Sequence, residues 1–276
     1  MSVTKAVRRA SAGLFHALAE LGSARLSPPR DPRAAAHRLA GALGVIANAH
    51  DLTVTVRGEV PRGAALIVAN HVSYLDPLAI LPNCPAVPVA KGEVEGWPIV
   101  GPIGEALGVI FVKRGDRFDR VRVLRRIDAL LAAGVPVLNF PEGTTTHGDR
   151  VEPFWRGGFG VAQRRGVRVV PVAIRYADPA LAWCGDATFI PHYARTLARS
   201  KIEVELVFGE PMMPRTGEVP EAMAERARNV IARMLEGGHD AGSRTDVSPP
   251  RPDPILPATF DRGDGQRRRR ARRRAA

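Results

Sequence analysis

The sequence predicts an α/β fold: a single αβα-layered domain with a largely parallel mixed sheet, preceded by an N-terminal helical pair and followed by a disordered basic tail. The first reason is that short, nearly continuous apolar runs alternate with stretches of helical periodicity, which is typical of a parallel sheet covered on both faces. The second is that 276 residues with 45% hydrophobic content can bury one full core. We therefore expect helices over residues 1–50, a core domain over 51–238 and a tail over 239–276.

The first 50 residues have the pattern of two helices. Apolar side chains recur at helical spacing over residues 3–23, with the basic residues largely off that stripe, which predicts a basic amphipathic helix. Prolines interrupt the pattern, and Asp31 is placed to cap a second helix from about Pro32 to Ala49. The pair is interpreted either as a hairpin packed on the core or as a membrane-surface anchor.

The spacing of apolar residues changes to that of strands from Leu52 onward. Residues 52–56 alternate as in an exposed or edge strand, whereas residues 64–69 form a continuous apolar run suited to a buried strand. Further strands are expected at 87–90, 108–112, 135–140, 167–174 and 202–208, and helices at 120–133, 157–165 and 221–235. In such sheets, functional residues gather in the loops at the strand ends.

Composition restricts the classes of function. The net charge is +12, but seven arginines lie between Gln266 and Ala276, so the basic character is mostly local to the tail. With only 5% aromatic residues and no stacking motif, a nucleic-acid-binding role is disfavoured, although a protein that binds nucleic acid through this tail remains an alternative. The two cysteines, Cys84 and Cys184, are isolated, so neither a metal site nor a redox pair is predicted. We also expect no signal peptide and no transmembrane helix.

The segment from Asn70 to Asp76 sets a histidine and a carboxylate five residues apart, directly after the predicted buried strand. Five residues turn an ideal helix by about 500°, so His71 and Asp76 can meet only if the histidine lies in the loop and the aspartate in the first turn of the next helix. Ser73 is then expected as the N-cap. Asp76 would fix the imidazole tautomer while the other nitrogen takes a proton from a hydroxyl. Ser73 lacks the flanking glycines of a nucleophile elbow, so an acyl-enzyme is disfavoured.

Two later strand ends carry residues suited to an anionic substrate. Lys113 and Arg114 follow one strand, and the arginine fork matches phosphate oxygens, although a solvated basic strand end is the alternative interpretation. After the next strand, Glu142, Gly143 and Thr144 form a turn. Its backbone amides would face a phosphate or an oxyanion, and Glu142 would orient the acceptor hydroxyl or a phosphate-binding cation, although a plain tight turn would look the same.

Together these segments resemble the 1-acylglycerol-3-phosphate acyltransferase (lysophospholipid acyltransferase) family, the glycerolipid acyltransferases with an Asn-His-x4-Asp signature. The similarity covers roughly Leu52 to Met213 and includes Asn70 to Asp76, Gly108 to Arg114, Phe140 to Thr144 and Val170 to Val172. It implies that residues 51–238 are an acyltransferase domain with His71 and Asp76 as the catalytic pair. It further implies that Lys113, Arg114, Glu142, Gly143 and Thr144 bind substrate.

The resemblance also implies an acyl-CoA or acyl carrier protein thioester as co-substrate, a lysolipid acceptor, and no cofactor or metal. It implies a peripheral membrane protein on the cytoplasmic face of the bacterial inner membrane, bound to an anionic lipid surface. The expected acceptor is 1-acylglycerol-3-phosphate, giving phosphatidic acid. However, Thr145 and Thr146 stand where the family often has Arg-Ser, so a phosphate-facing cation is missing and lyso-ornithine lipid is the alternative acceptor. Trp183 to Asp186, followed by Pro191 and His192, also resembles the ornithine-lipid branch.

Overall fold

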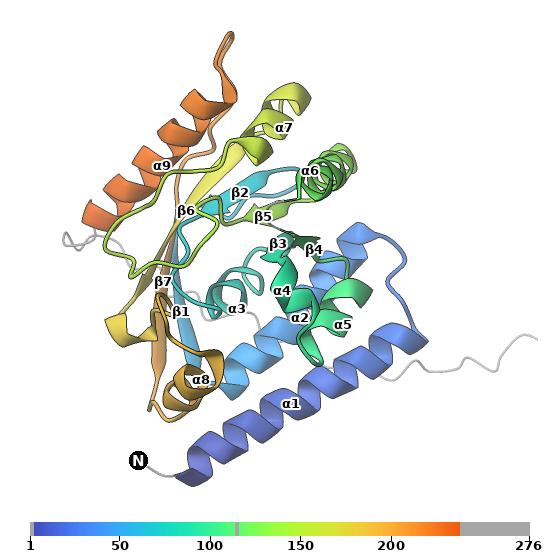
Figure 1. The fold of residues 1–276 in the computed structure, drawn as a ribbon, viewed down its shortest axis with the longest axis vertical. Coiled ribbons are helices and arrows are strands. Elements are labelled where there is room, and N and C mark those ends of the chain that lie inside the picture. The colour runs from blue at the N-terminus through green and yellow to red at the C-terminus, as the bar shows by residue number, and fades with distance from the viewer. Residues whose placement is uncertain (1–2, 114–115, 238–276) are drawn as a thin grey trace, which may run out of the picture.

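The computed structural model describes residues 3–113 and 116–237, and its centre is a seven-stranded sheet (Figure 1). The strand order is β1-β7-β6-β2-β5-β3-β4, and every neighbouring pair is parallel except β6 and β7. The strands are β1 (Leu52–Arg57), β2 (Leu66–Ala69), β3 (Val87–Lys91), β4 (Ile110–Val112), β5 (Val137–Asn139), β6 (Val169–Tyr176) and β7 (Ile202–Phe208). The predicted largely parallel mixed sheet is therefore confirmed. The predicted tail over 239–276 lies outside the described residues.

Helices cover both faces of this sheet (Figure 1). One face is covered by α6 (Arg117–Ala132), α7 (Gly157–Arg165) and α9 (Pro220–Glu236). On the other side lie α1 (Val3–Leu26), α2 (Pro32–Ala49), α3 (Asp76–Ile80), α4 (Gly92–Glu95), α5 (Val100–Ala106), the 3-10 helix η1 (Pro179–Leu181) and α8 (Phe189–Leu197). The αβα layering follows the prediction. Helices α3, α4 and α5 are too short for a clear sequence period, whereas α8 is amphipathic but is not among the predicted helices.

The central strand β2 explains why its sequence is apolar without alternation. Leu66 and Val68 pack into the core on the α6 and α7 side, and Ile67 and Ala69 pack into the core on the α3 side. Because successive side chains point to opposite faces of a sheet, a strand covered on both faces needs apolar residues at every position. All four β2 side chains are fully buried, so the end of β2 is a rigid base for the loop that follows.

The two predicted N-terminal helices are present and packed together. The Asp31 side chain accepts a hydrogen bond from the Ala34 amide, which confirms its role as the cap of α2. Arg9 of α1 is 1% exposed; it pairs with Asp51, and its Nη1 donates to the Leu197 carbonyl at the end of α8 (3.0 Å). Through these contacts the buried Arg9 guanidinium holds α1 against the rest of the domain.

Helix α1 also carries exposed apolar side chains, namely Val7, Leu14, Phe15 (68% exposed), Leu18 and Leu26 (90% exposed). Within the ranges 3–113 and 116–237, none of the helices combines the length and hydropathy needed to cross a bilayer.

Candidate active site

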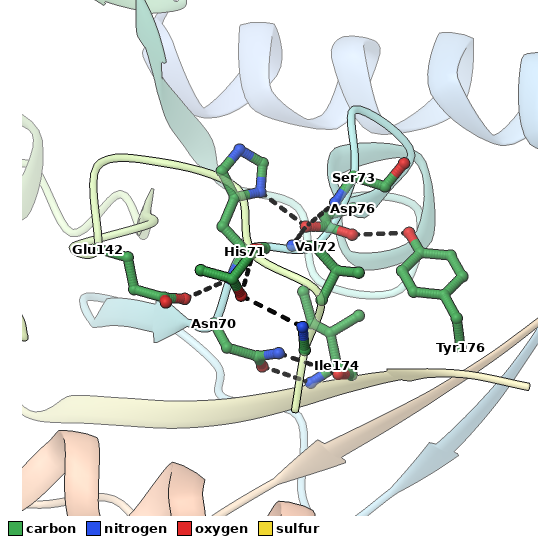
Figure 2. Close-up of polar contacts among 10 residues, drawn as sticks. Asn70, His71, Val72, Ser73, Asp76, Glu142, Ile174 and Tyr176 are labelled. Carbon is green, nitrogen blue, oxygen red and sulfur yellow. Dashed lines mark hydrogen bonds and ion pairs between the residues drawn. The ribbon is translucent and has the colours of Figure 1, made fainter. Parts of the chain in front are cut away.

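The centre of the candidate site is the loop from β2 to α3, shown in Figure 2. His71 lies in the loop and Asp76 begins α3, as the spacing predicts. The imidazole Nδ1 of His71 and Oδ2 of Asp76 are 2.7 Å apart. The two side chains therefore form a hydrogen-bonded pair at the carboxyl end of the central strand.

The predicted N-cap role of Ser73 is wrong. Helix α3 starts at Asp76 itself, no side chain caps it, and the buried Ser73 hydroxyl has no partner in the described part of the chain. Instead, Oδ2 of Asp76 accepts the backbone amides of Val72 (2.7 Å) and Ser73 (3.1 Å). The loop closes on the aspartate because a buried carboxylate satisfies two amides as well as the imidazole, which a serine hydroxyl could not do.

The carboxylate of Asp76 is fully buried, and both of its oxygens are hydrogen-bonded. Oδ2 receives the three donors above, and Oδ1 accepts the phenol of Tyr176 at 2.6 Å (Figure 2). Burial, with the nearby carboxylate, holds the pKa of Tyr176 well above its usual value, so the phenol stays protonated and donates. An ionised carboxylate is tolerated in a buried position when such donors replace its water.

The imidazole of His71 is fixed by stacking as well as by Asp76. Its ring lies 4.2 Å from the Phe140 ring between centroids, with an interplanar angle of 19°. The side chain is 18% exposed, and Nε2 has no partner among the described residues. The pair thus presents one ring nitrogen that is oriented and available to a ligand.

Glu142 holds the backbone of the site. Its Oε1 accepts the His71 amide (2.7 Å) and its Oε2 accepts the Glu152 amide (2.9 Å). Burial raises the pKa of Glu142, while these two hydrogen bonds favour its ionised form. The side chain is only 5% exposed, so the contacts that it makes are with the site's own loops.

Further hydrogen bonds tie neighbouring segments to the His71 loop. The Thr146 amide donates to the His71 carbonyl (2.8 Å), and the Trp183 amide donates to the Val72 carbonyl (2.9 Å). The buried Asn70 side chain bonds both the amide and the carbonyl of Ile174 on β6. Three separate segments therefore meet around one short loop.

The other residues predicted to bind substrate make no hydrogen bond to His71 or Asp76 within the described part of the chain. Gly143 adopts a φ of 70° in the turn, and its amide donates to the Phe140 carbonyl (3.1 Å). Thr144 is exposed, and its amide has no protein partner within 3–113 and 116–237. Lys113 is 66% exposed and its Nζ lies 3.8 Å from a Glu95 oxygen; within the described residues no hydrogen bond or ion pair joins it to the His71–Asp76 pair. Arg114 lies outside the described residues.

Sequence reasoning missed three residues that shape the site. Asn70 is visible only as part of the Asn-His segment, and Phe140 only as the residue before the Pro-Glu-Gly turn. Tyr176 is 100 positions from Asp76, and no spacing signal connects them. Among the residues that the structure describes, no cluster of histidine, cysteine and acidic side chains is arranged to hold a metal ion.

Comparison with known proteins gives consistent matches. The family model described as Acyltransferase matches residues 51–175. The chain is 34% identical to a lyso-ornithine lipid O-acyltransferase of Pseudomonas aeruginosa over 67% of this chain and 72% of that protein. It is 37% identical to a 1-acyl-sn-glycerol-3-phosphate acyltransferase of Neisseria gonorrhoeae over 49% of this chain and 51% of that protein.

A solved structure also matches over most of the fold. The crystal structure of the 1-acyl-sn-glycerophosphate (LPA) acyltransferase from Thermotoga maritima superposes with a TM-score of 0.59 and 25% identity. The similarity covers 83% of this chain and 91% of that one.

Proposed function

The chain belongs to the lysophospholipid acyltransferase family, and from that premise we propose that it moves a fatty acyl group from a thioester to a lysolipid hydroxyl with His71 as general base. The observation that carries this proposal is the His71–Asp76 pair, in which Nδ1 is held at 2.7 Å and Nε2 is unpartnered in the described chain. Asp76 fixes the tautomer and stabilises the imidazolium that forms.

In the proposed step, Nε2 of His71 takes the proton as the acceptor oxygen attacks the thioester carbonyl. An ester bond forms, the carbon–sulfur bond breaks, and the thiol leaves with the proton returned by the imidazolium. Electron pairs and protons balance without a cofactor. The Thr144 amide, which lacks a protein partner in the described chain, is our candidate donor to the developing oxyanion, since the Gly143 amide is already bonded within its turn.

Transfer without an acyl-enzyme is supported by the surroundings of Ser73 and Cys184, two side chains that could otherwise act as nucleophiles. Ser73 is fully buried, so its hydroxyl is shielded from a thioester. Cys184 lies 3.3 Å from Nε2 of His147, but partial burial and Asp149 raise the pKa of its thiol. A thiol with a raised pKa is a poor nucleophile at neutral pH.

For the acceptor, we favour a lyso-ornithine lipid. The relatives with that name are matched over more of their length than the Neisseria protein. The absence of a cation at Thr145 in the third motif fits a head group without an exposed phosphate. The second candidate is 1-acylglycerol-3-phosphate, which the Neisseria and Thermotoga proteins are named for and which Lys113 would help to bind.

We further propose that the enzyme works at an anionic membrane surface, because both acceptors are lipids. The exposed apolar side chains of α1 are suited to lie in the interface, and the arginines of 266–276 add attraction to anionic lipid at about 1 kcal/mol each near the surface. Vesicle sedimentation that is unchanged on deleting 266–276 would reject the part played by the tail.

The test of the activity is transfer of a radiolabelled acyl group by the purified full chain to a panel of lysolipids, with acyl-CoA and with acyl carrier protein as donors. His71→Ala should lower kcat by about 10²- to 10⁴-fold. His147→Ala, which removes an exposed histidine in a neighbouring loop, is the matched control and should stay within twofold. Retained transfer by His71→Ala, or no transfer to any lysolipid by the unaltered chain, would overturn the proposal.

A further inference from the structure

The outer surface of α6 carries a basic groove that the proposed chemistry does not use. Its lining includes Leu124, Arg122 and the Asp128–Arg165 pair. We define the α6 groove by the five remaining residues of the lining: Arg117, Phe118, Val121 and Arg125 of α6 and Arg164 of α7. It consists of two adjoining depressions of about 510 Å³ each. All five residues are exposed, which makes them available to a partner.

The cations of this groove are only partly neutralised by the acidic residues around them. Asp119 is bonded by Arg122 and by the Lys113 amide, and Asp128 is paired with Arg165. By contrast, Arg117 and Arg125 make no ion pair within the described residues, and Arg164 interacts with Asp128 only beyond ion-pair distance. The α6 groove therefore presents a net positive charge.

The groove also contains exposed apolar side chains. Phe118 is 77% exposed and Val121 is 48% exposed, and the Arg117 guanidinium lies 5.5 Å from the Phe118 ring centroid. Exposed aromatic and arginine side chains together are typical of surfaces that bind proteins. The charge extends over about 12 Å of helix from Arg117 to Arg125 and continues onto α7, which is broader than one phosphate group needs.

Two features of the topology connect this groove to the active site. Strands β2, β5, β3 and β4 are parallel neighbours, so the loops after β2 and β4 leave the same edge of the sheet. His71 follows β2, and α6 begins just after β4, three strand spacings or about 14 Å along that edge. A partner on the start of α6 is within reach of His71 for a long flexible thioester arm.

The groove also lies on the other side of the sheet from α1. Helix α6 packs into the core shared with α7 and α9, whereas α1 packs on the opposite core with α2 (Figure 1). If the exposed apolar side chains of α1 rest on a membrane, the α6 groove is turned away from that layer and remains open to a water-soluble partner.

We infer that the α6 groove docks an acidic acyl carrier protein that presents the acyl group as a phosphopantetheine thioester. The inference rests on the proposed acyl transfer and narrows its donor to a protein. An acidic surface would pair with the three arginines of the groove, an apolar contact would cover Phe118, and the arm would extend along the sheet edge to His71.

The test compares steady-state kinetics of the full chain with acyl carrier protein and acyl-CoA donors of the same chain length. The double variant Arg117→Glu/Arg125→Glu should raise KM for the carrier-protein donor about tenfold or more, since two exposed ion pairs are replaced by repulsion. Its kcat/KM with acyl-CoA should stay within twofold, which also shows that it is folded. Arg233→Glu, a single charge reversal of the same kind on α9, is the control and should alter the KM for neither donor.

Equal loss with both donors would mean that the groove holds the coenzyme or supports the fold, and would overturn the inference. Loss of binding to anionic vesicles without a change in KM would assign the groove to lipid and would also overturn it. Unaltered protein that uses acyl-CoA but not the carrier-protein donor would reject the docking surface while the proposed acyl transfer stands. Failure with both donors would reject the proposed transfer itself.

Discussion

Replacing Tyr176 by phenylalanine isolates a single hydrogen bond to the buried carboxylate. The phenol donates to Oδ1 of Asp76 at 2.6 Å and is the only partner of that oxygen in the described chain. Three other donors remain on Oδ2. The variant therefore leaves the His71 contact in place and removes only the support on the far side of the carboxylate.

The expected cost follows from the charge of the acceptor. Loss of a hydrogen bond to a charged group costs about 1.5–3 kcal/mol, which for a domain of this size lowers Tm by roughly 3–12 °C. The loss also removes one restraint on the carboxylate that holds Nδ1 of His71. The rate at neutral pH should fall in consequence.

The assay is kcat and KM at neutral pH together with thermal unfolding. Tyr193→Phe is the matched control, because it removes a phenol bonded to a neutral imidazole, His50 Nε2 at 2.8 Å, away from the His71–Asp76 pair. It should lower stability by about 1 kcal/mol and leave kcat unchanged. A Tyr176→Phe variant with a lower Tm and an unchanged kcat would refute a positioning role, and one with neither change would refute the reasoning altogether.

Three further outcomes are expected. Glu142→Gln sets an amide group against one of two backbone amides, so it should lower the free energy of unfolding by about 1–3 kcal/mol and reduce kcat; an unchanged urea midpoint would contradict the geometry. Arg9→Met should cost about 1–3 kcal/mol in urea titrations because it leaves the carbonyls at the end of α8 unpaired, whereas the more exposed Lys5→Met should cost under about 1 kcal/mol. Burial lowers the pKa of His50 and His192 below 6.5, so the unfolded chain binds protons first and Tm should fall as pH drops below about 6.5; His50→Gln should flatten this dependence, and the exposed His37→Gln should not.

The sheet is the part of the fold that the sequence predicts well. Residues 64–69 form a continuous apolar run, and residues 167–174 are apolar except for Arg168, because β2 and β6 are covered on both faces. Helix α4 leaves no comparable pattern, because it has only four residues. Helix α8 is amphipathic over its nine residues, so the sequence does carry a signal for it, although it is not among the predicted helices.

The candidate site likewise has a part that the sequence predicts and a part that it does not. His71 and Asp76 are close in the chain, and the helical geometry of five residues limits how they can meet, so their placement in loop and first turn was predictable. Ser73 was misplaced because local propensity favours a serine cap, whereas the tertiary structure uses the buried carboxylate as the acceptor for the loop amides. Tyr176 reaches Asp76 from β6, and only the three-dimensional arrangement of strands brings the two together.

The hydrogen bonds around His71 have a consequence for how this site can vary. The His71 amide is held by Glu142, its carbonyl by Thr146 and its Nδ1 by Asp76, while the ring face rests on Phe140. Within the described residues only Nε2 is left to meet a substrate, so the proposed catalytic unit is fixed by contacts that do not involve the acceptor's head group. Selectivity for that head group must then come from the loops beyond, including the one with Thr144 and Thr145. One catalytic arrangement is therefore compatible with relatives named for different lysolipids.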